Sequence, residues 1–132
     1  MGSAYALAPP NAAPKLYIYP MNPVIPTGAA SVIIFDLLLD SDYDFLWDRI
    51  TESHNLPYSI YLQDATRGRT LMGSPAAPIF NENIAGPGRL PYWLPKPVLI
   101  PRGTILSGTF SNRVAGGANT VVFSLVGKKV SR

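Results

Sequence analysis

The chain has 132 residues, of which 47% are hydrophobic and 14% are charged. This length suits one domain with a buried core and is too short for two. The charged fraction lies well below the quarter or so that is typical of globular domains, which indicates surface that a partner buries. The sequence contains no cysteine, so disulfides and thiolate metal sites are excluded.

Proline and glycine punctuate the whole chain, with 14 and 11 residues that follow no fixed repeat. Both residues disfavour helices, so this composition favours many short strands joined by turns. The longest apolar run, residues 32–39, is interrupted by Asp36 and falls far short of the roughly 20 residues that span a bilayer. The opening residues lack the basic and apolar regions of a signal peptide. We therefore expect neither export nor a membrane partner.

Charge is distributed unevenly along the chain. Residues 1–66 contain two basic and seven acidic side chains, whereas residues 67–132 contain nine basic side chains and one acidic one. Strands from the two halves can interleave in a fold and cancel this difference locally. The basic residues are scattered, and their longest cluster is Lys128-Lys129. We therefore expect a mixed, solvated surface and no nucleic-acid partner.

The first 29 residues contain six prolines and a single charged residue, Lys15. Such a segment cannot form a core of its own, so we predict an extended N-terminal arm over residues 1–29 that lies along another surface. A domain over residues 30–132 follows it. The strand-like anchor of the arm, predicted to contact a partner, consists of Leu16, Tyr17, Ile18 and Tyr19. The alternative is that this anchor is the first strand of the domain.

The next segments carry strand signals. Residues 31–39 are rich in β-branched and other apolar side chains, which predicts a strand buried on both faces. Residues 43–53 alternate with a period of two, which favours a strand over the competing helix. Residues 58–72 have the pattern of a hairpin whose turn covers residues 65–69.

A long irregular stretch is predicted for residues 73–95, because prolines and glycines recur throughout it. Connections of this length are usually functional or packed on a neighbour. The stretch ends in an apolar tip, where we predict that Leu90, Tyr92 and Trp93 contact a partner.

The C-terminal third predicts strands over residues 97–100, 104–112 and 119–130, separated by proline and glycine turns. About seven or eight strands follow one another along the chain, and nothing in the pattern alternates strands with helices. The sequence therefore predicts an all-β fold, a single antiparallel β-sandwich of the jelly-roll or immunoglobulin-like kind.

Residues that carry chemistry are few. The one histidine, His54, has no nucleophile motif beside it, so we interpret it as a polar turn residue and not as a catalytic base. Asp40, Asp42 and Asp44 have the spacing of a calcium loop but lack the glycine and distant glutamate that complete one. We interpret them as turn-capping and surface charges, with a cation site as the alternative. We expect no enzymatic activity and no catalytic, cofactor-binding or metal residues.

Several segments resemble a pattern found in small virion proteins of tailed bacteriophages. They are residues 40–47, 94–105, 110–112 and 121–129. The resemblance extends over roughly residues 36–130, so it leaves the N-terminal arm outside. Its motifs describe a scheme of strands and turns and carry no catalytic residues.

The resemblance implies a β-sandwich structural subunit of the virion, of the capsid decoration or cement type. Such a subunit would bind the major capsid protein or other virion proteins, form homo-oligomers and be assembled in the host cytoplasm. Two alternatives stay open: a tail, neck or fibre-attachment component of the virion, and a carbohydrate-binding module that stacks sugars on exposed aromatic side chains.

Overall fold

The computed structural model describes residues 15–28, 31–84 and 91–130, and it is built almost entirely of β-strands. The strands are β1 (Lys15–Met21), β2 (Val24–Ile25), β3 (Val32–Leu38), β4 (Asp44–Ser53), β5 (Tyr58–Asp64), β6 (Arg69–Met72), β7 (Ile79–Phe80), β8 (Tyr92–Ile100), β9 (Ile105–Asn112), β10 (Asn119–Thr120) and β11 (Val122–Val130). One short 3-10 helix, η1 (Asn81–Asn83), follows β7. Among these residues no helix is long and apolar enough to cross a membrane.

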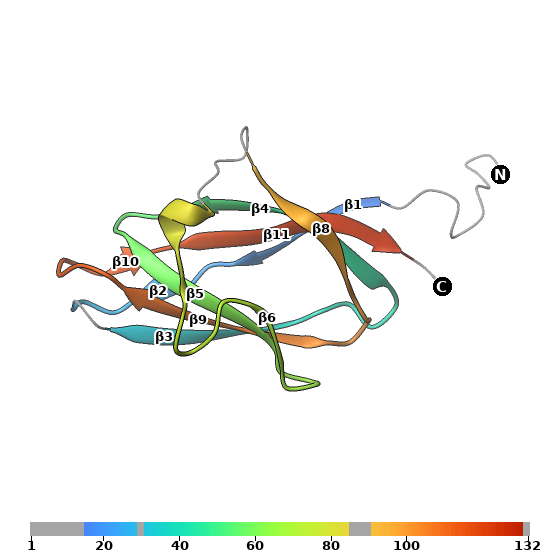
Figure 1. Cartoon of the computed structure of the whole chain (residues 1–132), viewed down its shortest axis with the longest axis horizontal. Helices are drawn as coiled ribbons and strands as arrows, with labels where there is room; N and C mark the ends of the chain where they lie inside the picture. The colour runs from blue at the N-terminus through green and yellow to red at the C-terminus, as the bar shows by residue number, and fades with distance from the viewer. Residues whose placement is uncertain (1–14, 29–30, 85–90, 131–132) are drawn as a thin grey trace, which may run out of the picture.

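Two antiparallel sheets pack face to face, as the two layers of Figure 1 show. The β1 sheet has the strand order β1-β11-β4-β8, and the β3 sheet has the order β3-β9-β5-β6, with β7 also paired to β5. Strands β2 and β10 form a small separate ladder. The predicted all-β sandwich is therefore confirmed.

The pairing of the long strands is nested. β1 pairs with β11, β3 with β9, β4 with β8 and β5 with β6, so each strand of the first half meets its counterpart from the second half. This is a long antiparallel hairpin rolled into two layers, which is the jelly-roll arrangement. Of the two predicted alternatives, the topology selects the jelly roll.

The core lies between the sheets and is formed by the inward side chains of each strand. In β5 these are Tyr58, Ile60 and Leu62, all fully buried, and in β4 they include Phe45 and Trp47. The alternation follows from the two-residue period of a strand. Each fully buried large apolar side chain contributes roughly 1.5–3 kcal/mol to folding. The predicted strand at residues 43–53 and the predicted hairpin at residues 58–72 are both confirmed.

Acidic residues of the first half of the chain pair with basic residues of the second half. These ion pairs are Asp40 with Lys129, Asp44 with Arg102, and Asp64 with Arg67 and Arg69. The rolled hairpin brings the two halves together, and these pairs cancel part of the charge difference locally.

The predicted arm differs from the structure at its C-terminal end. Residues 15–21 form β1, which pairs with β11 along its whole length, and the side chains of Met21 and Ile25 are fully buried. Residues 15–28 of the expected arm therefore include strands of the sandwich, as the alternative of a first strand at Leu16–Tyr19 predicted. The rest of the expected arm, residues 1–14, lies outside the described residues.

Two further predictions are corrected. The irregular stretch expected to reach residue 95 ends earlier, because β8 begins at Tyr92. The two prolines within β8 are tolerated because β8 is an edge strand. On the side of an edge strand that has no neighbour, a missing N–H removes no hydrogen bond between strands. The strand at residues 31–39 was expected to be buried on both faces, which is wrong: β3 is also an edge strand, and alternate side chains along it are exposed.

Candidate interaction surface

The outer face of the β1 sheet gathers side chains from all four strands of the sheet. The strand register places Leu16, Lys128, Leu46 and Leu99 in one row across the sheet, and Ile18, Val126, Arg49 and Trp93 in another. The row Tyr19, Leu125, Ile50 and Tyr92 points the opposite way, into the molecule. We call the eight outward residues of the first two rows the β1-sheet face.

This face is largely apolar, and four of its large side chains are open to solvent, while Val126 in its middle is only 5% exposed. Leu16, Ile18, Trp93 and Leu99 are each between 49% and 60% exposed. Single exposed apolar side chains are common, but monomeric proteins rarely gather several large ones on one surface. The β1-sheet face therefore has the character of a surface that meets a partner.

A bulge in the sheet sets the positions of Arg49 and Trp93. The register between β4 and β8 shifts around Asp48, where four residues of β8 stand opposite one residue of β4. Trp47 donates its indole N–H to the carbonyl oxygen of Arg49 at 2.8 Å, and Arg49 pairs with Asp48 at 2.9 Å. The Arg49 guanidinium then lies 4.6 Å from the centre of the Trp93 ring. This cation–π contact holds the indole in place on the face.

The sequence-predicted contact residues divide between the two sides of the sheet. Leu16, Ile18 and Trp93 lie on the β1-sheet face, whereas Tyr19 is buried and its hydroxyl accepts a hydrogen bond from the Asp40 amide at 3.0 Å. Burial raises the pKa of Tyr19. Tyr17 packs against Tyr19 and under the amine of Lys129, which is 3.8 Å from its ring centre. Leu90 lies outside the described residues.

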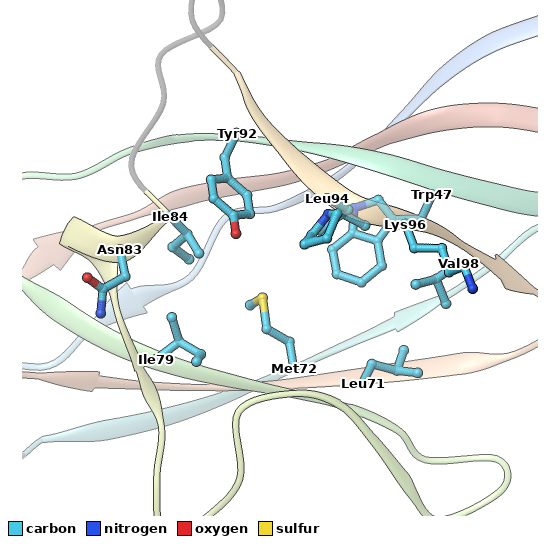
Figure 2. A pocket seen from close by; sticks show the side chains of 11 residues that line it. Trp47, Leu71, Met72, Ile79, Asn83, Ile84, Tyr92, Leu94, Lys96 and Val98 are labelled. Carbon is cyan, nitrogen blue, oxygen red and sulfur yellow. The ribbon is translucent and has the colours of Figure 1, made fainter.

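Tyr92 lines a pocket of about 410 Å³ at the sandwich edge where β8 faces β6, β7 and η1 (Figure 2). The lining is formed by Trp47, Leu71, Met72, Ile79, Asn83, Ile84, Tyr92, Leu94, Pro95, Lys96 and Val98. Three of the lining residues, Leu94, Pro95 and Lys96, belong to the part of β8 that has no partner residues on β4. Its size and apolar walls suit an apolar side chain or a small apolar molecule, with Lys96 as the cation of the lining.

His54 belongs to a hydrogen-bonded cluster that joins β4 to β5 and η1. Its Nδ1 lies 2.9 Å from a Glu52 carboxylate oxygen, which also accepts a hydrogen bond from the Tyr58 hydroxyl at 2.8 Å. Its Nε2 lies 3.4 Å from the Asn81 side-chain nitrogen. Burial raises the pKa of Tyr58 strongly and the Glu52 charge adds to this, so the phenol remains a donor. These contacts give the histidine a structural role.

The aspartates that suggested a calcium loop interact with protein groups. Asp40 accepts a hydrogen bond from the Asp42 amide at 2.8 Å, as a turn cap does, and its other oxygen lies 2.8 Å from the Lys129 amine. The hydrogen bond from Lys129 holds the pKa of Asp40 below its usual value. Asp44 accepts from the backbone and side chain of Arg102. Across residues 15–28, 31–84 and 91–130, no group of three or more His, Cys, Asp or Glu is placed to hold a metal ion.

Sequence reasoning missed five of the eight residues of the β1-sheet face, including Val126 on β11. Leu46, Arg49, Leu99 and Lys128 belong to it because of the strand register, which is shifted by two bulges, one in β8 where it pairs with β4 and one in β4, at Asp48, where it pairs with β11. Alternation along each strand was visible in the sequence, but which residues of β4, β8 and β11 stand opposite each other was not. Comparison of the chain with protein-family models and with curated proteins finds no match.

Proposed function

We propose that the chain is a non-enzymatic structural subunit of a bacteriophage virion, which binds the capsid shell and stabilises it as a decoration or cement protein. The observation that carries this proposal is the exposure of large apolar side chains on the outer face of the β1 sheet and along the edge strand β3. A sandwich that works alone would present polar side chains there. A subunit held between neighbours would keep such faces apolar.

The fold adds support at the level of analogy. Jelly rolls recur in viral capsid proteins, and also in lectins and enzymes, so the fold alone does not assign a function. The resemblance of residues 36–130 to small phage virion proteins favours the capsid among these. A subunit repeated over a shell also needs surfaces that meet several neighbours, which the two apolar faces provide.

Two other functions compete with this one. A tail, neck or fibre-attachment component would use similar surfaces, and it differs by its copy number in the particle. A carbohydrate-binding module would use the exposed indole of Trp93, although the Arg49 guanidinium already covers one side of that ring. A glycan array with Trp93→Ala as the control distinguishes this module, because only a sugar-binding protein loses glycan signal with that substitution.

The proposal predicts binding to shells that lack this chain. We expect purified protein to co-sediment with such shells, and the double variant Leu16→Asp, Ile18→Asp to bind at least about tenfold more weakly, because two charges enter an apolar contact. Val114→Asp is the matched control, since Val114 is a similarly exposed apolar residue in a loop away from the β1-sheet face. Equal binding by both variants, or no binding of the unchanged protein, contradicts the proposal.

A further inference from the structure

A second apolar surface lies on the opposite side of the sandwich, along the edge strand β3. Val32, Ile34 and Leu38 point outward from this strand, and Ile105 of β9 stands beside Leu38 in register. These four side chains are between 41% and 68% exposed. Together with Asp36, which lies between Ile34 and Leu38 on the same side of β3, we call them the β3-sheet face.

The composition of β3 is that of a strand covered on both sides. Its seven residues contain six apolar ones, and continuous apolar runs of this kind are typical of strands buried on both faces. The single chain covers only the inward set, in which Ile33, Phe35 and Leu37 pack on the core. The outward set is therefore suited to burial by another molecule.

The two faces carry unpaired charges of opposite sign. Asp36 is the anion of the β3-sheet face, and Lys128 is the cation between Leu16 and Leu46 on the β1-sheet face. Within residues 15–28, 31–84 and 91–130, neither side chain has a hydrogen bond or ion pair to another described residue. Arg49, the other cation of the β1-sheet face, is already paired with Asp48.

We infer that the β3-sheet face of one copy packs on the β1-sheet face of the next copy, with Asp36 placed against Lys128. The inference rests on the proposed function, because it names the neighbour that covers two of the subunit's surfaces. Sheets packed in this way lie about 10 Å apart with their side chains interdigitated. Since the two faces are on opposite sides of one subunit, the contact is heterologous, and it repeats until a ring closes or a chain extends.

Charge decides between this contact and its symmetric competitors. Two β3-sheet faces in contact would bring two Asp36 carboxylates into one apolar interface, and two β1-sheet faces would do the same with two Lys128 amines. Like charges opposed in an interface repel each other and disfavour the symmetric contacts, whereas the heterologous contact opposes unlike charges.

The size of the contact sets the conditions of the test. The β3-sheet face covers seven residues of β3 and the adjoining position of β9, which amounts to roughly 10 by 23 Å. This is smaller than the roughly 800 Å² per partner of a standard stable interface. Free copies are therefore expected to associate weakly and in a concentration-dependent manner, and to gain from the high local concentration on a shell.

A charge exchange tests the pairing in solution. Sedimentation velocity of the full chain over a range of concentrations should show reversible association. Asp36→Lys alone and Lys128→Asp alone should each lower the association constant by about tenfold or more, and the double variant should restore it. Asp42→Lys and Lys96→Asp make the same charge changes outside both faces and should leave the association unchanged.

Crosslinking provides a second readout that does not require the copies to associate tightly. The chain has no cysteine, so Asp36→Cys with Lys128→Cys introduces the only two thiols. A short bis-maleimide should convert this double variant into a ladder of trimers and larger species, whereas each single variant stops at a dimer. The pair Asp42→Cys with Lys96→Cys measures crosslinking by random collision.

Each outcome decides the inference. A ladder above the collision control and a restored double charge exchange support it. A chain that stays monomeric with no excess ladder, or whose Asp36→Cys variant alone crosslinks most efficiently, overturns it. If the protein binds shells but fails these tests, the contact between copies is refuted and the proposed function stands. If copies associate as expected but do not bind shells, the contact stands and the proposed function is refuted.

Discussion

Asp64, at the end of β5, is a fully buried carboxylate that organises the turn into β6. It accepts hydrogen bonds from the backbone amide and guanidinium of Arg67, at 3.0 and 2.9 Å, and from Arg69 at 3.3 Å. Burial alone would raise the pKa of Asp64, but these hydrogen bonds outweigh it and hold the pKa below the usual 3.8. The ionised form is therefore the one that the folded chain stabilises.

We predict that Asp64→Asn lowers the free energy of unfolding at pH 7 by about 1–3 kcal/mol, since buried donors lose a charged acceptor. The pKa of Asp64 is lower in the folded chain, so its contribution is complete above pH 3.8 and is lost as the pH falls through the folded value. Urea unfolding at pH 7 and near pH 3 should thus show a smaller difference between variant and parent in acid. Asp42→Asn, at an exposed turn, is the control, and an equal effect of both variants at pH 7 contradicts this role.

At the scale of elements, the bulge between β11 and β4 depends on a glycine. A Cβ atom at Gly127 would lie 2.1 Å from the carbonyl oxygen of Leu46 and 2.9 Å from the Cα of Trp47. Backbone atoms of a paired strand cannot yield to such a contact without moving the strand. The close approach of β11 to β4, and with it the placement of Leu46 on the β1-sheet face, therefore requires glycine.

Gly127→Ala is expected to destabilise the fold by about 1–3 kcal/mol, the range of overpacking in a filled interior. Chemical unfolding measures this directly. Gly117→Ala is the matched control, because its Cβ would meet nothing within 4 Å and should change stability by less than about 1 kcal/mol. Equal stability of the two variants would show that β4 adapts to the added methyl group.

The elements also show why some predictions from sequence succeeded and others did not. The strands at residues 43–53 and 58–72 were predictable because alternation has a short period and needs no tertiary information. β3 was misjudged because its apolar composition is that of a central strand, while its place at the edge depends on pairing with β9 alone.

The candidate site was predictable only in part for the same reason. Four consecutive residues from Leu16 to Tyr19 were assigned to one partner, but a strand sends neighbours to opposite sides. Leu16 and Ile18 therefore reach the β1-sheet face, while Tyr19 enters the core. Trp93 joins them across the sheet through the bulged register of β8, which no local pattern encodes.

At the scale of the whole molecule, the rolled hairpin brings the acidic first half of the chain beside the basic second half. Acidic and basic side chains from the two halves therefore form ion pairs. The rolled hairpin also leaves two apolar faces on opposite sides of one sandwich, each with a charge of opposite sign. The proposed subunit that repeats on a shell would use this combination of faces.

A cryo-electron-microscopy map of the native particle tests this account most directly. We predict density for the chain repeated over the shell, on the order of hundreds of copies, with the β3-sheet face of each copy on the β1-sheet face of a neighbour. Density confined to a single vertex, or no density for the chain in the particle, would contradict a capsid decoration protein.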